Sequence, residues 1–357
     1  MKNIITLCTL LCGILTSSCS QNPQGECLVI DLVNHKQLAV EQIALSDISE
    51  SIQIIPLETN DSVLVGRIYG IKLASNKLYV NASNGILVFD SNGKFLNTVG
   101  SKGRGPKEYV GLYDIFPEND IVWLLDDSGK KALKYTSSGR FLEDFDFEKH
   151  RFMEYFHSGS DTFIGFVPDL GQTDTDIMLA FFDSTGITDS LLYRNPITET
   201  GTMVMLYEEA TFINNGAKTK FKHVFNDTIY VVKDCKLIPD MALNLGARKA
   251  NEKARAEAAK QDMFTADPFK GMDRALLYGE NDRYLYLKVE SVSVFYDKKE
   301  QKVHKWEFSL PDDKRIDPEQ SKKFLPKYID KYGNLIGETT PANIEDNQVI
   351  IIAKLKR

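Results

Sequence analysis

The chain has 357 residues, a formal net charge of −7 and 43% hydrophobic residues. This length is ample for a buried core, and all-β folds of this size are often single domains. A mildly acidic chain without a basic stripe is a poor candidate for binding nucleic acid.

The N-terminus is typical of a bacterial lipoprotein signal. Lys2 precedes an apolar stretch at residues 4–15, and small residues then lead to Cys19. The apolar stretch is too short for a membrane-spanning helix, which needs about 20 residues. We therefore predict a signal peptide at residues 1–18, lipidation of Cys19 and a polar tether at residues 19–27. An ordinary secretory signal cut nearby is the alternative, because Thr16 stands where such motifs usually have Leu.

Residues 28–357 are predicted to form one domain that begins with two strands, near residues 28–32 and 52–57. After them, a short polar cue precedes a strand-like apolar run six times along the chain. The cues are Asn76-Lys77, Asn119-Asp120, Ser160-Asp161, Asn226-Asp227, Asn281-Asp282 and Asp346-Asn347. Repetition at a period of tens of residues indicates a repeat architecture.

A second repeat has glycine in a polar turn between two strand-like runs. Gly93, Gly139 and Gly186 lie 46 and 47 residues apart. Glycine suits hairpin turns that need a positive φ. A period in the forties with about four strands per unit is the length of a β-propeller blade. We therefore predict an all-β fold, a six-bladed β-propeller with four-stranded antiparallel blades.

The two ends of the chain complement each other. After Asn347 there is room for only one more strand, whereas the N-terminal runs have no blade of their own. We expect the N-terminal strands to join the last blade and close the ring, which removes exposed sheet edges.

A short helical insertion is predicted near residues 245–263, where Ala250, Ala254 and Ala258 lie at helical spacing. The insertion lacks large apolar residues, so we expect it to be exposed, either as decoration between blades or as a lid. With the signal removed, Cys27 and Cys235 are the cysteines left to pair. A disulfide between them is one alternative and two separate thiols the other.

The chain resembles the six-bladed β-propeller lipoproteins of Bacteroidetes, which are related in architecture to NHL-type propellers. The resemblance rests on the lipoprotein signal, the repeats, the segment Gly103-Arg104-Gly105-Pro106-Lys107-Glu108-Tyr109, and the Ile-Pro-Leu-Glu sequence that ends at Glu58. It implies a propeller fold and a lipid-anchored protein of the cell envelope. A shared fold does not supply a function.

In such a blade, the loop to the next blade and the loop between the second and third strands lie on one face. The segment 103–109 then lies beside Asn81–Gly85, Asp126–Lys130 and Pro168–Gln172, and loops on a rigid scaffold often bind ligands. Candidate binding residues that would ring one mouth of the central channel are Arg104, Tyr109, Asp126, Asp127 and Lys130. Alternatively, these residues only shape the turns.

His157 is a further candidate, because His157 and His223 lie in apparent first strands, which line the channel. The five histidines show no metal-ligand spacing, and Asp126-Asp127-Ser128-Gly129 does not match a calcium loop. We therefore predict no metal and no cofactor. No nucleophile elbow and no distinct pair of carboxylates appears.

The sequence thus favours a binding module over an enzyme. Its ligand would be a glycan, a peptide or a small molecule, and an envelope protein is another candidate partner. The membrane would be reached only through the lipid anchor, and the neutral residues after Cys19 favour the periplasmic side of the outer membrane over the cell surface. The alternative is a hydrolase, lyase or lactonase with catalytic groups at the channel mouth.

Overall fold

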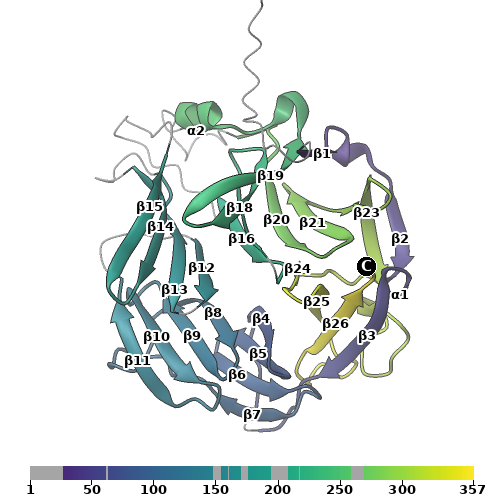
Figure 1. Cartoon of the computed structure of the whole chain (residues 1–357). Helices are drawn as coiled ribbons and strands as arrows, with labels where there is room; N and C mark the ends of the chain where they lie inside the picture. The colour runs from purple at the N-terminus through teal and green to yellow at the C-terminus, as the bar shows by residue number, and fades with distance from the viewer. Residues whose placement is uncertain are drawn as a thin grey trace, which may run out of the picture.

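The computed structural model describes residues 27–61, 63–147, 154–159, 161–169, 176–193, 208–216, 218–258 and 269–357. Its strands form six separate sheets around a central axis (Figure 1). This confirms the prediction of an all-β, six-bladed β-propeller. The predicted signal peptide, Cys19 and nearly all of the tether lie outside the described residues.

The first three blades each contain four antiparallel strands in chain order. Blade one contains β4 (Ile68–Ala74), β5 (Lys77–Ala82), β6 (Gly85–Asp90) and β7 (Phe95–Thr98). Blade two contains β8 (Leu112–Glu118), β9 (Ile121–Asp126), β10 (Lys131–Thr136) and β11 (Phe141–Asp146). Blade three contains β12 (Glu154–Gly159), β13 (Thr162–Phe166), β14 (Ile177–Asp183) and β15 (Gly186–Leu192).

The last three blades each gain a strand from the N-terminal segment. Blade four contains β16 (Ala210–Asn214), β17 (Thr219–His223), β18 (Thr228–Lys233), β19 (Lys236–Asn244) and β1 (Leu28–Asp31). Blade five contains β20 (Ala275–Glu280), β21 (Tyr284–Val289), β22 (Val292–Asp297), β23 (Lys302–Ser309) and β2 (Val40–Ala44). Blade six contains β24 (Tyr328–Ile329), β25 (Asn334–Thr339), β26 (Val349–Leu355) and β3 (Ser49–Pro56).

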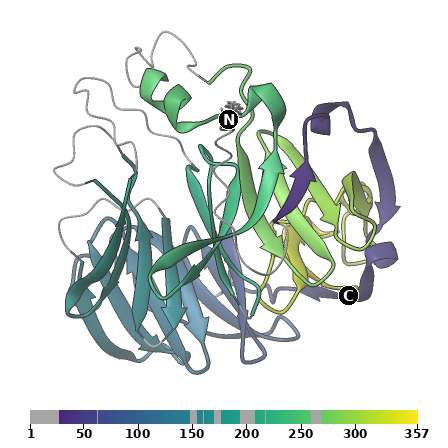
Figure 2. The same cartoon turned by 45° about the horizontal axis from the view of Figure 1, so that its top comes forward.

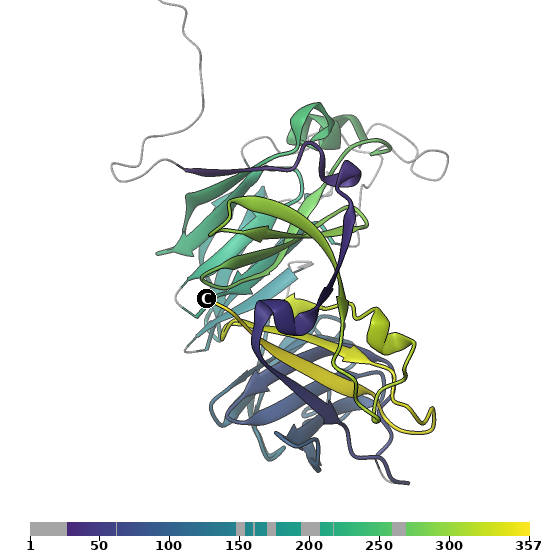
Figure 3. The same ribbon diagram turned by 90° about the vertical axis from the view of Figure 1, so that its right-hand side faces the viewer.

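The N-terminal segment runs along the outside of blades four, five and six, as the purple ribbon of Figure 3 shows. β3 pairs antiparallel with β26 and closes the ring as predicted. β1 differs from the prediction, because it adds a fifth, parallel strand to blade four instead of joining the last blade. β2, which was not predicted, adds a fifth, parallel strand to blade five. Both satisfy the outer edge of a blade, which would otherwise leave unpaired backbone groups.

Five short helices complete the described part of the chain: η1 (His35–Gln37), α1 (Leu45–Ile48), η2 (Gly246–Arg248), α2 (Glu252–Ala258) and η3 (Gln320–Lys322). α2 lies on the rim of the ring above blades three and four (Figure 2).

The core consists of apolar layers between neighbouring blades. A strand that is covered on both faces is apolar throughout, and β26 shows this with Ile350 and Ile351 both fully buried. Between blades five and six, the rings of Tyr286 and Phe295 stack at 4.5 Å beside the aliphatic side chains of blade six. The blades therefore adhere through packing across their faces.

The glycine turns behave as predicted. Gly93 and Gly139 lie between the third and fourth strands of blades one and two, and Gly186 begins the fourth strand of blade three; their φ angles are 84°, 86° and 114°. The polar cues are less uniform. Four of them precede a second strand, but Asn226-Asp227 and Asp346-Asn347 precede the third strands β18 and β26. This offset lengthens the intervals that end at these two cues.

The helical insertion is not wholly exposed, which corrects the prediction. The side chain of Arg255 in α2 is only 2% exposed, and it forms ion pairs with Asp169 at 3.3 Å and Glu209 at 3.4 Å. Its guanidinium also lies 4.9 Å from the ring centre of Tyr193. The long cationic side chain of Arg255 thus anchors a helix that lacks large apolar residues. Residues 259–263 of the predicted insertion lie outside the described part of the chain.

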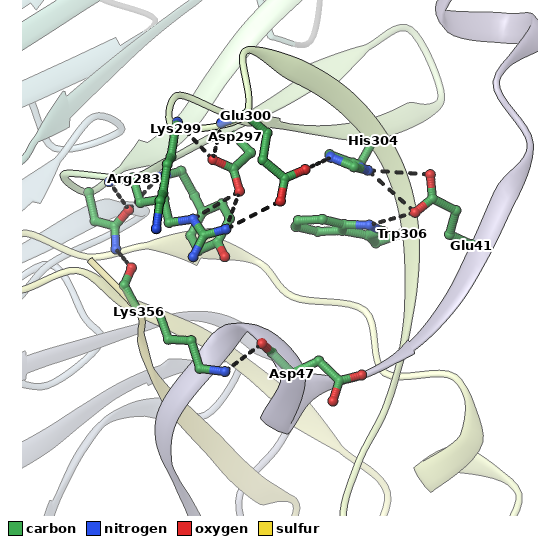
Figure 4. A network of polar contacts seen from close by, with 11 residues as sticks. Glu41, Asp47, Arg283, Asp297, Lys299, Glu300, His304, Trp306 and Lys356 are labelled. Carbon is green, nitrogen blue, oxygen red and sulfur yellow. Dashed lines mark hydrogen bonds and ion pairs between the residues drawn. The ribbon is translucent and has the colours of Figure 1, made fainter.

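Polar contacts fasten the N-terminal segment to blade five and to the C-terminus (Figure 4). The Nδ1 atom of His304 lies 3.3 Å from both carboxylate oxygens of Glu41 in β2, and the indole of Trp306 donates a hydrogen bond to the same carboxylate. The Nζ atom of Lys356 donates to the carbonyl of Asp47 in α1 at 2.7 Å. Cys27 and Cys235 are not bonded to each other.

Replacing Ile351 with Ala tests the ring closure. Its side chain is fully buried in β26, directly opposite Ile54 of β3. We expect the free energy of unfolding in urea to fall by about 2–5 kcal/mol, because a buried cavity remains. Val29→Ala, at a side chain that is 61% exposed in β1, serves as the control and should cost less than about 0.5 kcal/mol. Equal effects of the two substitutions would contradict the account.

Candidate functional site: the central channel

The first strands of all six blades surround a cavity of about 350 Å³ on the axis of the ring. We call this cavity the central channel. It is lined by residues 72–73, 113–118, 154–159, 211–214, 277–278 and 328–331. Each of these ranges belongs to the first strand of a different blade or directly follows it, so the channel exists only because the ring is closed.

A cluster of charged side chains and tyrosines lies in and beside the channel. The Nζ atom of Lys72 in β4 lies 2.8 Å from the Oδ2 atom of Asp114 in β8. The hydroxyl of Tyr113 donates a hydrogen bond to Glu154 of β12. Across the ring, Tyr278 of β20 donates to Glu208 at 2.5 Å. We call these six residues the polar cluster.

Burial raises the pKa of Glu154 to about 8. Burial is the largest contribution to this net value; the charges of Glu208 and Asp114 also raise the pKa, while the hydrogen bond from Tyr113 and the charge of Lys72 lower it. At neutral pH, Glu154 therefore carries a proton. Burial also raises the pKa of Tyr113 and of Tyr278. The polar cluster thus contains a carboxyl group whose pKa is strongly raised and two tyrosines whose pKa values are raised as well, and such shifts are common at functional sites.

Aromatic rings form much of the channel wall. Tyr113 and Tyr155 meet edge to face with their ring centres 4.9 Å apart, and Phe156 lies 5.9 Å from Phe212. The ammonium group of Lys72 lies 5.6 Å from the ring centre of Phe116. Rings beside a few convergent polar groups are typical of small-molecule sites.

His157 lies on the channel wall in β12, as its predicted position in a first strand requires. Its side chain is 8% exposed, and its Nδ1 atom lies 3.8 Å from Glu118. The Nε2 atom is buried and has no hydrogen-bond partner. Burial lowers the pKa of His157. His223 corrects the prediction, because it ends the second strand β17 and lies 3.1 Å from Glu209.

Asp127 and Lys130 lie in the turn between β9 and β10 and reach the channel wall indirectly. The carboxylate of Asp127 accepts hydrogen bonds from Lys130 at 2.8 Å and from the hydroxyl of Tyr155, a lining residue, at 2.9 Å. Asp126 is fully buried and accepts hydrogen bonds from the backbone N–H groups of residues 110, 111 and 129. It fixes the loops of blade two.

Arg104 and Tyr109 do not ring the channel mouth, which corrects the prediction. Tyr109 is buried in the apolar layer between blades one and two, and Arg104 is exposed. The loop that holds them lies over the outer strands of blade two, since the hydroxyl of Tyr135 in β10 donates to the carbonyl of Lys107. The loop joins two blades on the predicted face but packs away from the axis.

The polar cluster was missed by sequence reasoning. Five of its members lie in blades one, two, three and five, and Glu208 lies just before blade four. Apart from the adjacent Tyr113 and Asp114, they are far apart between residues 72 and 278, so no local spacing marks them. The available signal was a charged side chain within an otherwise apolar first strand, as in Ile71-Lys72-Leu73 and Tyr113-Asp114-Ile115. Reading that signal requires knowing which strand of each blade is the first.

In the described part of the chain, no group of three or more His, Cys, Asp or Glu side chains is placed to hold a metal ion. The described helices are all too short or too polar to cross a membrane.

The profile of DUF4934, a domain of unknown function, matches residues 27–354. The chain belongs to the DUF4934 family. No curated protein matches it. The fold of this DUF4934 protein is similar to that of a Bacteroides fragilis protein described by its name as exported, with a TM-score of 0.64 and 16% identity over 92% of this chain and 100% of that chain. A DUF4221 family member from Bacteroides vulgatus gives a TM-score of 0.50 and 11% identity over 86% and 96% of the two chains. At these identities the likeness shows the fold alone.

Replacing Glu154 with Gln tests the protonation of the polar cluster. An unfolded Glu has a pKa near ~4.3, so between about pH 4.3 and about pH 8 the folded protein holds a proton that the unfolded chain has lost. The free energy of unfolding therefore falls as pH rises through this window, by at most about 1.4 kcal/mol per pH unit from this group.

Urea unfolding at several pH values measures this slope. We expect Glu154→Gln, which cannot ionise, to show a flatter profile than the wild type, whereas Glu345→Gln, at an exposed loop position, should keep the wild-type slope. Identical profiles for Glu154→Gln and the wild type would contradict the assignment.

Proposed function

We propose that this DUF4934 protein is an extracytoplasmic binding module that takes a small ligand, or the end of a glycan or peptide, into the central channel. The observation that supports this most strongly is the polar cluster beside a cavity of about 350 Å³. Small-molecule sites have volumes of roughly 300–1,000 Å³ and combine apolar walls with a few convergent polar groups. Here an ion pair and hydrogen bonds within the scaffold hold such groups in place.

The channel residues have distinct proposed roles. Glu154 and Tyr113 would contact the ligand directly, and His157 would do so further along the channel. Asp127 and Lys130 would hold the hydroxyl of Tyr155 in position from behind. Arg104, Tyr109 and Asp126 have no contact role in this proposal, because two of them are buried away from the channel and Arg104 lies on a loop over blade two.

A second candidate function is an enzyme of the hydrolase, lyase or lactonase type. The observation that favours it is the same protonated Glu154, held between a tyrosine hydroxyl and further carboxylates. A buried carboxyl group with a pKa near neutrality suits general acid–base catalysis. We rank this candidate second because the residues of the site do not indicate which bond of a substrate would be cleaved.

Blocking the channel tests the binding proposal. Ser158 is an exposed residue on the channel wall, so Ser158→Trp should fold and fill the cavity. In a thermal-shift screen of monosaccharides, dipeptides and small amines, we expect any compound that stabilises the wild type to lose its effect on Ser158→Trp. Ser158→Ala is the matched control and should respond like the wild type. Compounds that stabilise Ser158→Trp as strongly as the wild type would place the site elsewhere and contradict the proposal.

The predicted lipid anchor at Cys19 would hold this module at the outer membrane, on the periplasmic side. The sequence motif and the exported relative of similar fold support this proposal. In fractionated cells, we expect Cys19→Ala to move the protein from the membrane fraction to the soluble fraction. A protein that stays with the membrane after this substitution would contradict lipid anchoring. Protease treatment of intact cells checks the side, because a periplasmic protein should survive it.

A further inference from the structure

The charges and rings that line the central channel suit a cation. The lining carboxyl groups are those of Asp114, Glu118, Glu154 and Asp330, whereas the lining ammonium groups are those of Lys72 and Lys331. Seven aromatic side chains share the wall with them. Because aromatic faces and carboxylates both attract positive charge, we infer that the channel binds a small organic cation with its charged nitrogen beside Glu154. This inference rests on the proposed function of the channel as a ligand site.

Lys72 shows what kind of group this wall stabilises. Its ammonium group pairs with Asp114 and lies 5.6 Å and 5.9 Å from the ring centres of Phe116 and Tyr328. A protonated amine of a ligand would find the same two kinds of neighbour, a carboxylate and aromatic rings, at Glu154. Within the described residues, neither Glu154 nor Glu208 forms an ion pair with a lysine or arginine, since each accepts a hydrogen bond from a tyrosine hydroxyl.

His157 supplies a second, independent indication that the channel receives a ligand. More than nine tenths of its side chain is buried on the channel wall, and its Nε2 atom has no hydrogen-bond partner. Leaving a buried polar group unpaired costs about 1–3 kcal/mol, so such an atom in a native protein calls for an explanation. A hydrogen bond from a bound ligand, after a small rotation of the ring, provides one.

The spacing of the two features sets the approximate span of the inferred ligand. Glu154 and His157 lie three residues apart on β12, and a strand rises about 3.3 Å per residue, so their backbones are roughly 10 Å apart along the strand. Their side chains leave alternate faces of β12, and both residues line the channel. The inferred ligand is therefore an elongated amine with a hydrogen-bonding group at its other end. A second amine would also suit that end, where Glu118 lies 3.8 Å from His157.

Binding of a cation at Glu154 couples to protonation. The pKa of Glu154 is influenced by Tyr113 and Asp114 from β8, by Lys72 from β4 and by Glu208. Glu208 also accepts a hydrogen bond from Tyr278 of β20. A bound ammonium group favours the ionised carboxylate and lowers the pKa of Glu154 from about 8. Binding should therefore release a proton, and the affinity should increase as pH rises toward 8.

Calorimetric titration of the full mature protein with two matched probes tests the inference. Hexamethylenediamine is a linear dication, and hexanediol has the same chain with neutral hydroxyl ends. We expect the diamine to bind at least about tenfold tighter than the diol, which is a difference of about 1.4 kcal/mol. Its affinity should increase several-fold between about pH 7 and about pH 8.5.

Variants of the polar cluster show where the cation binds. Glu154→Gln keeps the size of the side chain and should weaken diamine binding about tenfold and remove its pH dependence. Tyr113→Phe offers a second, conservative change at the same carboxyl group and should weaken binding less. Glu345→Gln is the control and should bind like the wild type. Circular dichroism confirms that each variant is folded.

The outcomes separate the two proposals. If the diol binds as tightly as the diamine, or if Glu154→Gln leaves diamine binding unchanged, the cation inference is overturned. The channel itself then stands if Ser158→Trp still abolishes binding of the diol. If neither probe binds at millimolar concentration, the cation inference also fails, and the screen with the blocked channel decides the binding function.

Discussion

The pairing of β3 with β26 is the constraint on which the rest of the structure depends. The C-terminal part of the chain supplies only three strands to blade six, so the fourth must come from the N-terminal segment. The two strands pair from Val349 opposite Pro56 to Leu355 opposite Ser49. Without this ladder, blade six would expose the edge of β26, and blade one would lose its contact with Ile55 of β3. The polar contacts of His304 and Lys356 hold the same segment at two further points.

Closure determines the site as well as the fold. The first strands lie nearest the axis only in a complete ring, and the polar cluster takes its members from four different blades and, with Glu208, from the segment just before blade four. An ionisable group in such a place is costly to bury, so it is found where hydrogen bonds or opposite charges compensate. Lys72 and Asp114 provide that compensation for each other, and the two tyrosines provide it for Glu154 and Glu208. The cluster is therefore preorganised before any ligand enters.

The sequence allowed the fold to be predicted further than the site. The turn glycines and the polar cues follow from local chemistry, because a positive φ or a tight turn limits which residues fit. These patterns predicted the number of blades. The shortage of strands after Asn347 predicted that the N-terminal segment closes the ring. The parallel pairing of β1 with β19 and of β2 with β23 could not be predicted in this way, because an apolar run does not specify which sheet edge it joins. Blades four and five therefore have one strand more than expected.

Site residues were harder to predict because their positions depend on contacts between distant blades. Gly103–Tyr109 is a recognisable motif, yet its tyrosine packs into the layer between blades and its loop lies over outer strands. Arg255 was expected to be exposed on a polar helix, but its guanidinium is buried between two carboxylates. By contrast, nothing in the sequence links Asp114 with Glu154, because they belong to different blades. Only the ring brings them together.

A crystal structure of the protein grown with hexamethylenediamine would test the central claim most directly. The account predicts electron density for the diamine in the central channel, with one nitrogen within hydrogen-bond distance of Glu154 and the chain extending toward His157. A diamine bound only on the outer surface, with the channel unchanged, would contradict it.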